Sequence, residues 1–200
     1  MSQSQIPGLQ LVRFGEAPNE LLSLEGEVET IVWKEFQNRS GTYASRSPQE
    51  ISAGLFKIDI GGDMVVETPM IAPEHLASYE HMVAQQEKIQ SSILLRLLKW
   101  YSELRPRVFR EVEAIGWSMP EVNQPEDFRR LIGLSSIHLM NVHRDGKAYV
   151  GYEFGCSWDE EHGLGLMMHG DRVVEVGHAD KSFLTWVADC LLYTSPSPRD

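Results

Sequence analysis

The sequence predicts an α+β fold in which an antiparallel sheet, ending in a four-strand meander, packs against one long helix. Three observations predict it. Apolar residues alternate with a period of two near both ends of the chain, and they recur at helical spacing after Pro73. Short turns containing Gly and Asp separate the C-terminal strands. The chain has 200 residues, enough for one domain with a full core, which we expect over residues 1–189.

The N-terminal part of this domain, about residues 9–67, is expected to form strands. Segments rich in apolar residues and bounded by Gly, Pro, Asn and Glu predict two of them, at residues 9–14 and 28–36. Residues 55–60 alternate, the turn Gly61-Gly62-Asp63 follows, and residues 64–67 would return as the second arm of a hairpin. The polar residues 38–49 predict a loop between these strands.

The middle of the chain, about residues 73–131, is expected to be helical. Pro73 suits the first turn of a helix, and Pro106 is expected to end that helix near Leu104. A helix of about 30 residues would be ~45 Å long, and its apolar stripe predicts a face buried in the core. The polar run 85–88 interrupts this stripe. Further helical segments are expected at residues 107–115 and 125–131.

The C-terminal part, about residues 134–189, returns to a period of two. Four strands are expected at residues 137–142, 147–157, 163–169 and 172–176. Asp145-Gly146 and Gly170-Asp171 predict tight turns, and Asp180 predicts the start of a final helix. One face of the second strand carries Gly151 and Gly155, which predicts that another element packs closely on its backbone.

Strand direction predicts which reactive side chains meet. The loop from Trp158 to His162 follows the second strand, and the fourth strand runs back to the same end of the sheet. That end is expected to gather Asp159, Glu160, Glu161, His162, His178 and Asp180. His143 and His169 belong to the opposite end, since His169 lies about 20 Å along the third strand from His162.

Two interpretations of this loop remain open. Two imidazoles with carboxylates can bind a divalent transition metal that activates water. The candidate ligands are His162, His178, Asp159, Glu161 and Asp180. In the structural alternative, Asp159 accepts backbone hydrogen bonds in an Asx turn, Glu160 and Glu161 are solvated, and Trp158 closes the edge of the sheet. The loop has no His-Glu-x-x-His motif, and the structural alternative is the favoured one.

Two further side chains have simple interpretations. Cys156 alternates with Phe154 and Tyr152, which predicts a buried and unreactive thiol. His138 lies in an apolar strand, which predicts a histidine with satisfied hydrogen bonds in the core or at its edge. His75 is expected to face solvent or to be half-buried on the long helix.

Composition limits the classes of function. The formal net charge of −11 disfavours nucleic-acid binding and suits a protein whose partner is basic. No apolar run approaches the ~20 residues that span a bilayer, no signal peptide is recognised, and the cysteine usage predicts a cytoplasmic protein. The first hypothesis is therefore a binding protein, for example of the toxin-immunity type. The second is a metal-dependent hydrolase at the 158–162 loop, so whether the chain is an enzyme stays open.

The end of the chain has an unusual composition. Residues 190–200, Cys-Leu-Leu-Tyr-Thr-Ser-Pro-Ser-Pro-Arg-Asp, resemble a translated transposon-end sequencing adapter. We therefore expect this tail to be an artefact and the natural sequence to be cut at about Asp189. Cys156 would then be the only cysteine of the natural chain.

Several runs of residues together resemble a known family. They are Pro73 to Tyr79, Leu131 to Leu134, Ile137-His138, Ala148 to Gly165, Arg172 to Gly177, Ala179-Asp180 and Ser182-Phe183. The longest contains the unusual run Cys-x-Trp-Asp-x-Glu-His-Gly, from Cys156 to Gly163. These runs are similar to an uncharacterised bacterial family, a domain of unknown function numbered 6985. The resemblance implies a bacterial, cytoplasmic protein and brings no catalytic residues with it.

Overall fold

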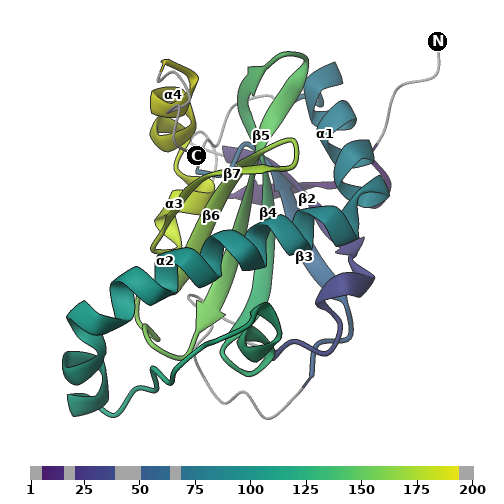
Figure 1. The fold of residues 1–200 in the computed structure, drawn as a ribbon. Helices are drawn as coiled ribbons and strands as arrows, with labels where there is room; N and C mark the ends of the chain where they lie inside the picture. Colours follow the sequence, from purple (N-terminus) through teal and green to yellow (C-terminus); the bar gives the residue numbers. More distant parts are fainter. Residues whose placement is uncertain (1–5, 16–20, 39–50, 64–68, 194–200) are drawn as a thin grey trace.

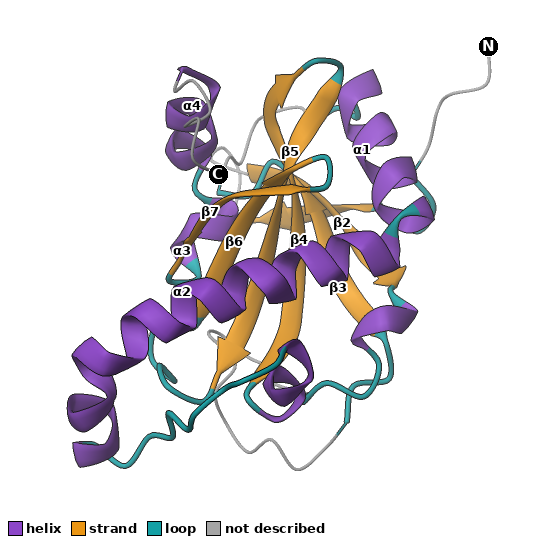
Figure 2. Ribbon diagram, viewed as in Figure 1, coloured by secondary structure: helices purple, strands orange, loops and turns teal. Residues whose placement is uncertain are grey.

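A seven-stranded mixed sheet lies at the centre of the molecule (Figures 1 and 2). The computed structural model describes residues 6–15, 21–38, 51–63 and 69–193. The strands follow one another in the sheet in their order along the chain. They are β1 (Gln10–Phe14), β2 (Leu21–Glu29), β3 (Leu55–Ile60), β4 (Ile132–Arg144), β5 (Lys147–Cys156), β6 (Leu164–His169) and β7 (Arg172–Gly177). The α-helices are α1 (Pro73–Ala84), α2 (Gln86–Ala114), α3 (Asp180–Phe183) and α4 (Thr185–Tyr193), and two 3-10 helices are η1 (Ile31–Trp33) and η2 (Pro125–Arg130).

One strand pair makes the sheet mixed. β3 and β4 run parallel, whereas every other neighbouring pair of the seven described strands is antiparallel. The expectation of an antiparallel sheet was therefore wrong at this pair. Between β3 and β4 the chain passes through α1 and α2, and a connection of that length lets a strand return in the same direction. Alternation of apolar residues predicts a strand but carries no information on its direction.

The single long helix predicted from Pro73 is in fact two helices. The backbone leaves the helical conformation at Gln85, with φ −118° and ψ 27°, at the start of the polar run. The predicted end at Pro106 was also wrong, because α2 continues through this residue. Pro106 is exposed, so water can solvate the carbonyl that the proline leaves unpaired. The burial of Val112 one and a half turns later favours continuation of the helix.

The main hydrophobic core lies between the sheet and α2, which crosses the front of the sheet in Figure 1. Aromatic side chains fill much of it. Trp33 of η1 packs edge-on against Phe154 of β5, with ring centroids 5.1 Å apart. Tyr101 of α2 packs in the same way against Phe128 and Trp158. These contacts bind α2, η1 and η2 to one face of the sheet.

On the opposite face of the sheet, two helices pack on the half formed by β4 to β7. α3 packs on all four of these strands, and α4 packs on β4. The approach is very close, because a Cβ added at Gly151 would lie 1.6 Å from the Ser182 carbonyl oxygen. A Cβ at Gly165 would lie 2.4 Å from the His178 carbonyl oxygen. The prediction that an element packs tightly on the glycine face of β5 is confirmed at Gly151.

Other predicted segments differ in detail. The second expected strand, residues 28–36, was largely wrong, because β2 spans Leu21–Glu29 and overlaps it only at residues 28 and 29, after which η1 follows. The helix expected from Asp180 is divided into α3 and α4, with Leu184 in extended conformation between them. The loop at 38–49, apart from Asn38, and the hairpin arm at 64–67 lie outside the described residues.

Of the C-terminal tail, residues 190–193 continue α4, and 194–200 also lie outside the described residues. The adapter origin of this tail stays a prediction. In the described ranges, no helix is both long enough and apolar enough to cross a bilayer.

Candidate functional site

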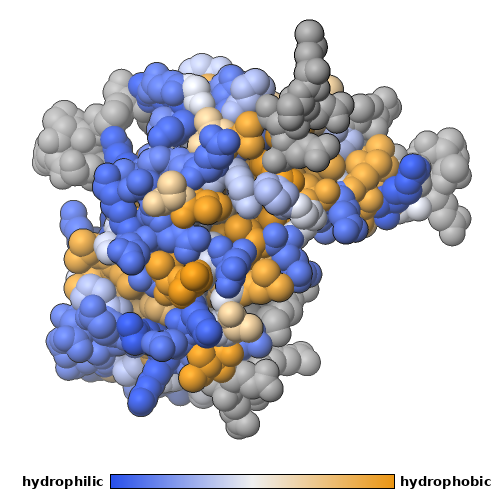
Figure 3. Space-filling view, turned by 90° about the vertical axis from the view of Figure 1, so that its right-hand side faces the viewer, coloured by the Kyte–Doolittle hydropathy of each residue, from blue (hydrophilic) through white to orange (hydrophobic). Residues whose placement is uncertain are grey.

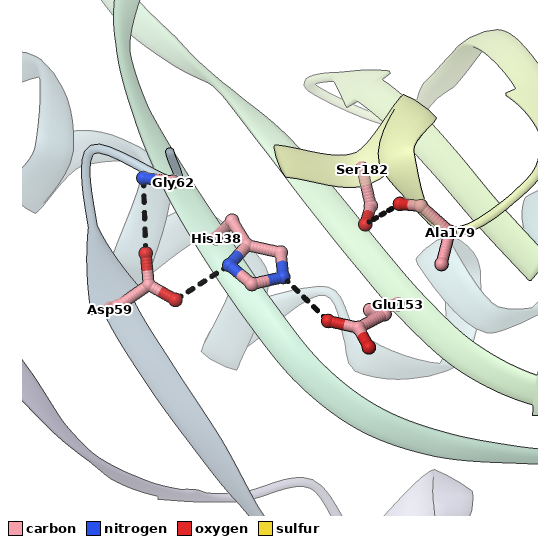
Figure 4. Close-up of polar contacts among 6 residues, drawn as sticks. All are labelled: Asp59, Gly62, His138, Glu153, Ala179 and Ser182. Carbon is pink, nitrogen blue, oxygen red and sulfur yellow. Dashed lines mark hydrogen bonds and ion pairs between the residues drawn. The ribbon is translucent and has the colours of Figure 1, made fainter. Parts of the chain in front are cut away.

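Three ionisable side chains meet on the sheet face opposite α2, one from each of three neighbouring strands. Asp59 of β3 is the Cα partner of His138 of β4 in the parallel pair. Glu153 of β5 is the partner of Ser136, two residues before His138, so it reaches the ring diagonally. Figure 4 shows the imidazole of His138 between the two carboxylates. We call Asp59, His138 and Glu153 the triad.

Hydrogen bonding occupies both ring nitrogens of His138. Nδ1 lies 2.5 Å from Asp59 Oδ2, and Nε2 lies 3.2 Å from Glu153 Oε2. Since carboxylates only accept hydrogen bonds, both nitrogens must donate, and the ring is an imidazolium. The second oxygen of Asp59 accepts the Gly62 N–H at 3.1 Å.

The surroundings of His138 act on its pKa in opposite directions. Burial disfavours the charged ring, but the charge and hydrogen bond of Asp59, together with those of Glu153, outweigh it and raise the pKa to about 9. The side chains of His138, Asp59 and Glu153 are 9%, 20% and 14% exposed, so water screens their attraction weakly. At neutral pH both ring nitrogens are protonated, so the ring has no free lone pair with which to act as a general base.

Helix α3 covers the triad. The Phe183 ring packs edge-on against the His138 ring at 5.7 Å. The Phe183 carbonyl accepts the Asp63 N–H at 3.0 Å, and a Cβ added at Gly62 would lie 2.3 Å from that carbonyl oxygen. The segment after β3 is therefore pinned against the end of α3. Gly62, with φ +62°, is the residue type that this crossing permits.

The hydroxyl of Ser182 is bonded within its own helix. It donates to the Ala179 carbonyl at 2.6 Å, within the turn of α3, as Figure 4 shows. Because both nitrogens of His138 are already bonded to carboxylates, the ring cannot accept a proton from Ser182. The arrangement is therefore not that of a serine nucleophile with its base.

A groove of ≈ 650 Å³ lies beside the triad, on β1 to β3. Its lining consists of Gly8, Gln10, Val12, Glu25, Gly26, Glu27, Leu55, Lys57, Ile58, Asp59 and Ser136. Glu25 is the Cα partner of Asp59 across β2 and β3, and Glu27 is the partner of Lys57. The lining thus carries three carboxylates and one ammonium group. Asp59 belongs to both the groove and the triad.

The structure brings together three of the residues predicted around the 158–162 loop. Asp159 Oδ1 lies 3.0 Å from His162 Nδ1, and Asp159 Oδ2 lies 3.6 Å from His178 Nε2. The two imidazole rings stack, with centroids 5.1 Å apart and planes at 23°. Their side chains are 56% and 63% exposed, so this pair lies at the surface.

The other predicted members of this site are not joined to the pair. Within the part of the chain that the structure describes, no hydrogen bond or ion pair connects Glu160, Glu161 or Asp180 with either histidine. One carboxylate oxygen of Asp180 is buried and has no partner among those residues. Over the same described ranges, no group of three or more His, Cys, Asp and Glu side chains could hold a metal ion.

The loop has the features of the structural alternative. Asp159 Oδ1 accepts the backbone N–H of His162 at 2.9 Å, which is the expected Asx turn. Trp158 is 3% exposed and packs between Tyr101 and Phe128. The prediction that Cys156 is buried is confirmed, and the low reactivity of its thiol stays a prediction.

Sequence reasoning missed the triad and misplaced His75. His138 was expected to have satisfied hydrogen bonds, which is correct, but its partners depend on the parallel pairing of β3 with β4. A signal was present in the period of two, which places Asp59, His138 and Glu153 each among apolar neighbours in a strand. His75 is buried rather than solvent-facing, and its Nε2 lies 3.1 Å from the Met140 carbonyl oxygen.

Comparison with known proteins adds the family. A family model described as "Domain of unknown function (DUF6985)" matches residues 32–184. The chain belongs to this family. The DUF6985 match includes the whole triad and the Asp159 loop, whereas Glu25 and Glu27 of the groove precede it. Neither the comparison with curated proteins nor the comparison with solved structures found a match.

Proposed function

We propose that this protein is a binding protein whose groove on β1 to β3 receives a basic segment of a protein partner. The observation that carries the proposal is the position of Glu25, Glu27 and Asp59 in one groove, on the half of the sheet face beside α3. Only Lys57 opposes them in the lining. The net charge of the chain, −11, favours the same kind of partner.

The negative charge of the protein would raise the rate at which it associates with a basic partner. An acidic surface attracts a basic partner over a distance of about 10 Å at ordinary salt, which raises the association rate. On the face shown in Figure 3, hydrophobic and hydrophilic side chains are interspersed. An immunity-type protein, which neutralises a basic toxin, is one form that such a binding protein can take.

The alternative, a metal-dependent hydrolase at the 158–162 loop, has less support. Oδ1 of Asp159 accepts the His162 backbone N–H in an Asx turn and also lies beside the His162 ring. Oδ2 faces His178. Glu161 and Asp180, which were expected to complete the ligand set, make no hydrogen bond or ion pair with this group among the described residues. We therefore propose no reaction for this loop.

The binding proposal can be tested with a labelled peptide of about twelve residues in which arginine and serine alternate. Fluorescence anisotropy would compare wild type with the double variant Glu25→Gln/Glu27→Gln. The control is Glu111→Gln/Glu113→Gln, which removes the same charge from exposed positions near the end of α2. We expect the groove variant to bind about tenfold more weakly, equivalent to ~1.4 kcal/mol, and the control to bind nearly as wild type.

Two outcomes would overturn the proposal. One is the absence of binding to wild type at moderate salt. The other is an equal loss of affinity in both double variants, since the peptide would then respond to total charge rather than to the groove.

A further inference from the structure

We propose that occupancy of the groove is coupled to the protonation of His138, because a cationic side chain bound beside Asp59 competes with the His138 imidazolium for the same carboxylate. This inference rests on the proposed function and names the regulation of the same groove. The bound group would be a guanidinium or an ammonium. In the bound state the ring would release its proton more readily, and a neutral ring would leave Asp59 to the ligand.

Asp59 lies between the His138 ring and the groove in which the cationic side chain would bind. One of its oxygens faces the His138 ring at 2.5 Å, while the residue also lines the groove. Glu25 is the Cα partner of Asp59 on the adjacent strand, so the two side chains leave the sheet next to each other on the groove face. Side chains directly opposite in a strand pair have Cβ atoms about 5 Å apart, a spacing that one guanidinium can bridge.

Two carboxylates act on the ring. Asp59 from β3 and Glu153 from β5 are the charges that raise the pKa of His138. The other charged side chains nearby are Lys57 in the groove and Asp180 and Lys181 on α3. From α3, the ring is contacted by the uncharged Phe183. The ammonium of Lys181 lies over the Trp186 ring at 5.0 Å. Among the described residues, Asp59 is the charged side chain that both lines the groove and bonds to His138.

Linkage makes the coupling reciprocal. If a bound cation lowers the proton affinity of His138 by some factor, then loss of that proton strengthens cation binding by the same factor. The triad is largely buried, so the repulsion between two cations that share one carboxylate is weakly screened. Nε2 donates to Glu153, and a ring that lost its Nδ1 proton would keep this hydrogen bond and its place.

NMR of the His138 ring, with and without saturating arginine–serine peptide, tests this coupling. Arginine keeps its charge throughout the pH range, so a peptide whose N-terminus is blocked does not itself titrate. We expect the midpoint of the His138 titration to fall when the peptide is bound. We also expect affinity to rise by about fivefold or more between pH 7.5 and 9.5, the lower end of ordinary coupling between sites.

Variants separate the possible explanations. His138→Gln should bind the peptide with an affinity that no longer rises over this pH range. Glu153→Gln should keep the coupling but move it to lower pH, because the ring loses one of its two carboxylates. Circular dichroism would verify that both variants are folded, and the titration of wild type requires neither of them.

An unchanged His138 midpoint in the saturated complex would overturn the coupling. If Glu25→Gln/Glu27→Gln still weakens peptide binding in that case, the proposed function stands and only this inference fails. If the double variant binds as wild type, the groove proposal itself is wrong.

Discussion

Asp59 and His138 are Cα partners across β3 and β4, the one parallel pair among the described strands, with Oδ2 and Nδ1 2.5 Å apart. The contact joins residues 79 positions apart in the sequence. It holds an imidazolium beneath α3 and fixes one carboxylate of the neighbouring groove. Several measurable properties follow from this pair and its surroundings.

The stability of the protein is predicted to fall as the pH rises from about 6.5 to 9. The folded-state pKa of His138, about 9, lies above the unfolded value of 6.5, so its contribution is fully present below pH 6.5 and is lost as the pH rises through 9. At 1.36 kcal/mol per pK unit the loss is at most roughly 3 kcal/mol. Urea unfolding at a series of pH values measures it. A wild-type curve parallel to that of His138→Gln would contradict the assignment.

His75 is predicted to act in the opposite direction. Burial lowers its pKa, although the hydrogen bond to the Met140 carbonyl partly offsets this. Its contribution is therefore present above the unfolded value of 6.5 and is lost as the pH falls toward the depressed folded pKa. Nδ1 accepts the Ala72 N–H, so the neutral ring should carry its proton on Nε2. Nitrogen NMR identifies the tautomer, with exposed His162 as the control, and a proton on Nδ1 would refute the prediction.

Gly151→Ala is predicted to displace α3. The new Cβ would lie 1.6 Å from the Ser182 carbonyl oxygen, which belongs to backbone and cannot rotate away. We expect a loss of about 3 kcal/mol or more, at the upper end of overpacking effects, and faster hydrogen exchange in α3. Gly146→Ala is the control, since its Cβ meets open space and only its φ of +74° costs energy, about 1 kcal/mol. Equal losses in the two variants would show that α3 does not pack on Gly151.

Trp158→Ala is predicted to destabilise the fold rather than to act on a single site. The ring packs edge-on against Tyr101 at 4.9 Å and is 3% exposed, so its removal should cost about 3–5 kcal/mol. Trp186 is 53% exposed, so Trp186→Ala should change the stability much less. Chemical denaturation compares the two variants. A small effect of Trp158→Ala would remove the structural explanation of the loop.

The sequence was informative where local periodicity decides the structure. Apolar content located β1, the period of two located β3 and the strands β4 to β7, and strand direction placed Asp159, His162 and His178 at one end of the sheet. The parallel pairing of β3 with β4 depends on a crossover through two helices, so local patterns could not reveal Asp59 as the partner of His138.

The helical region shows a second limit of local patterns. The polar run 85–88 interrupts the apolar stripe, but apolar residues recur at helical spacing on both sides of it, so the pattern alone predicted one helix where the backbone breaks at Gln85. Pro106 ordinarily signals the end of a helix, but the packing of residues beyond it keeps α2 intact. The boundary at Pro106 was thus decided by tertiary contacts, which the sequence does not display.

The most direct test of the groove is a map of amide chemical-shift changes on titration of the arginine–serine peptide into labelled protein. We predict that the largest changes occur in β1 to β3, at Glu25, Glu27 and Asp59 and their neighbours, and extend to His138. Changes centred on the Asp159 loop, or spread evenly over exposed acidic residues, would contradict the assignment of the groove as the binding site.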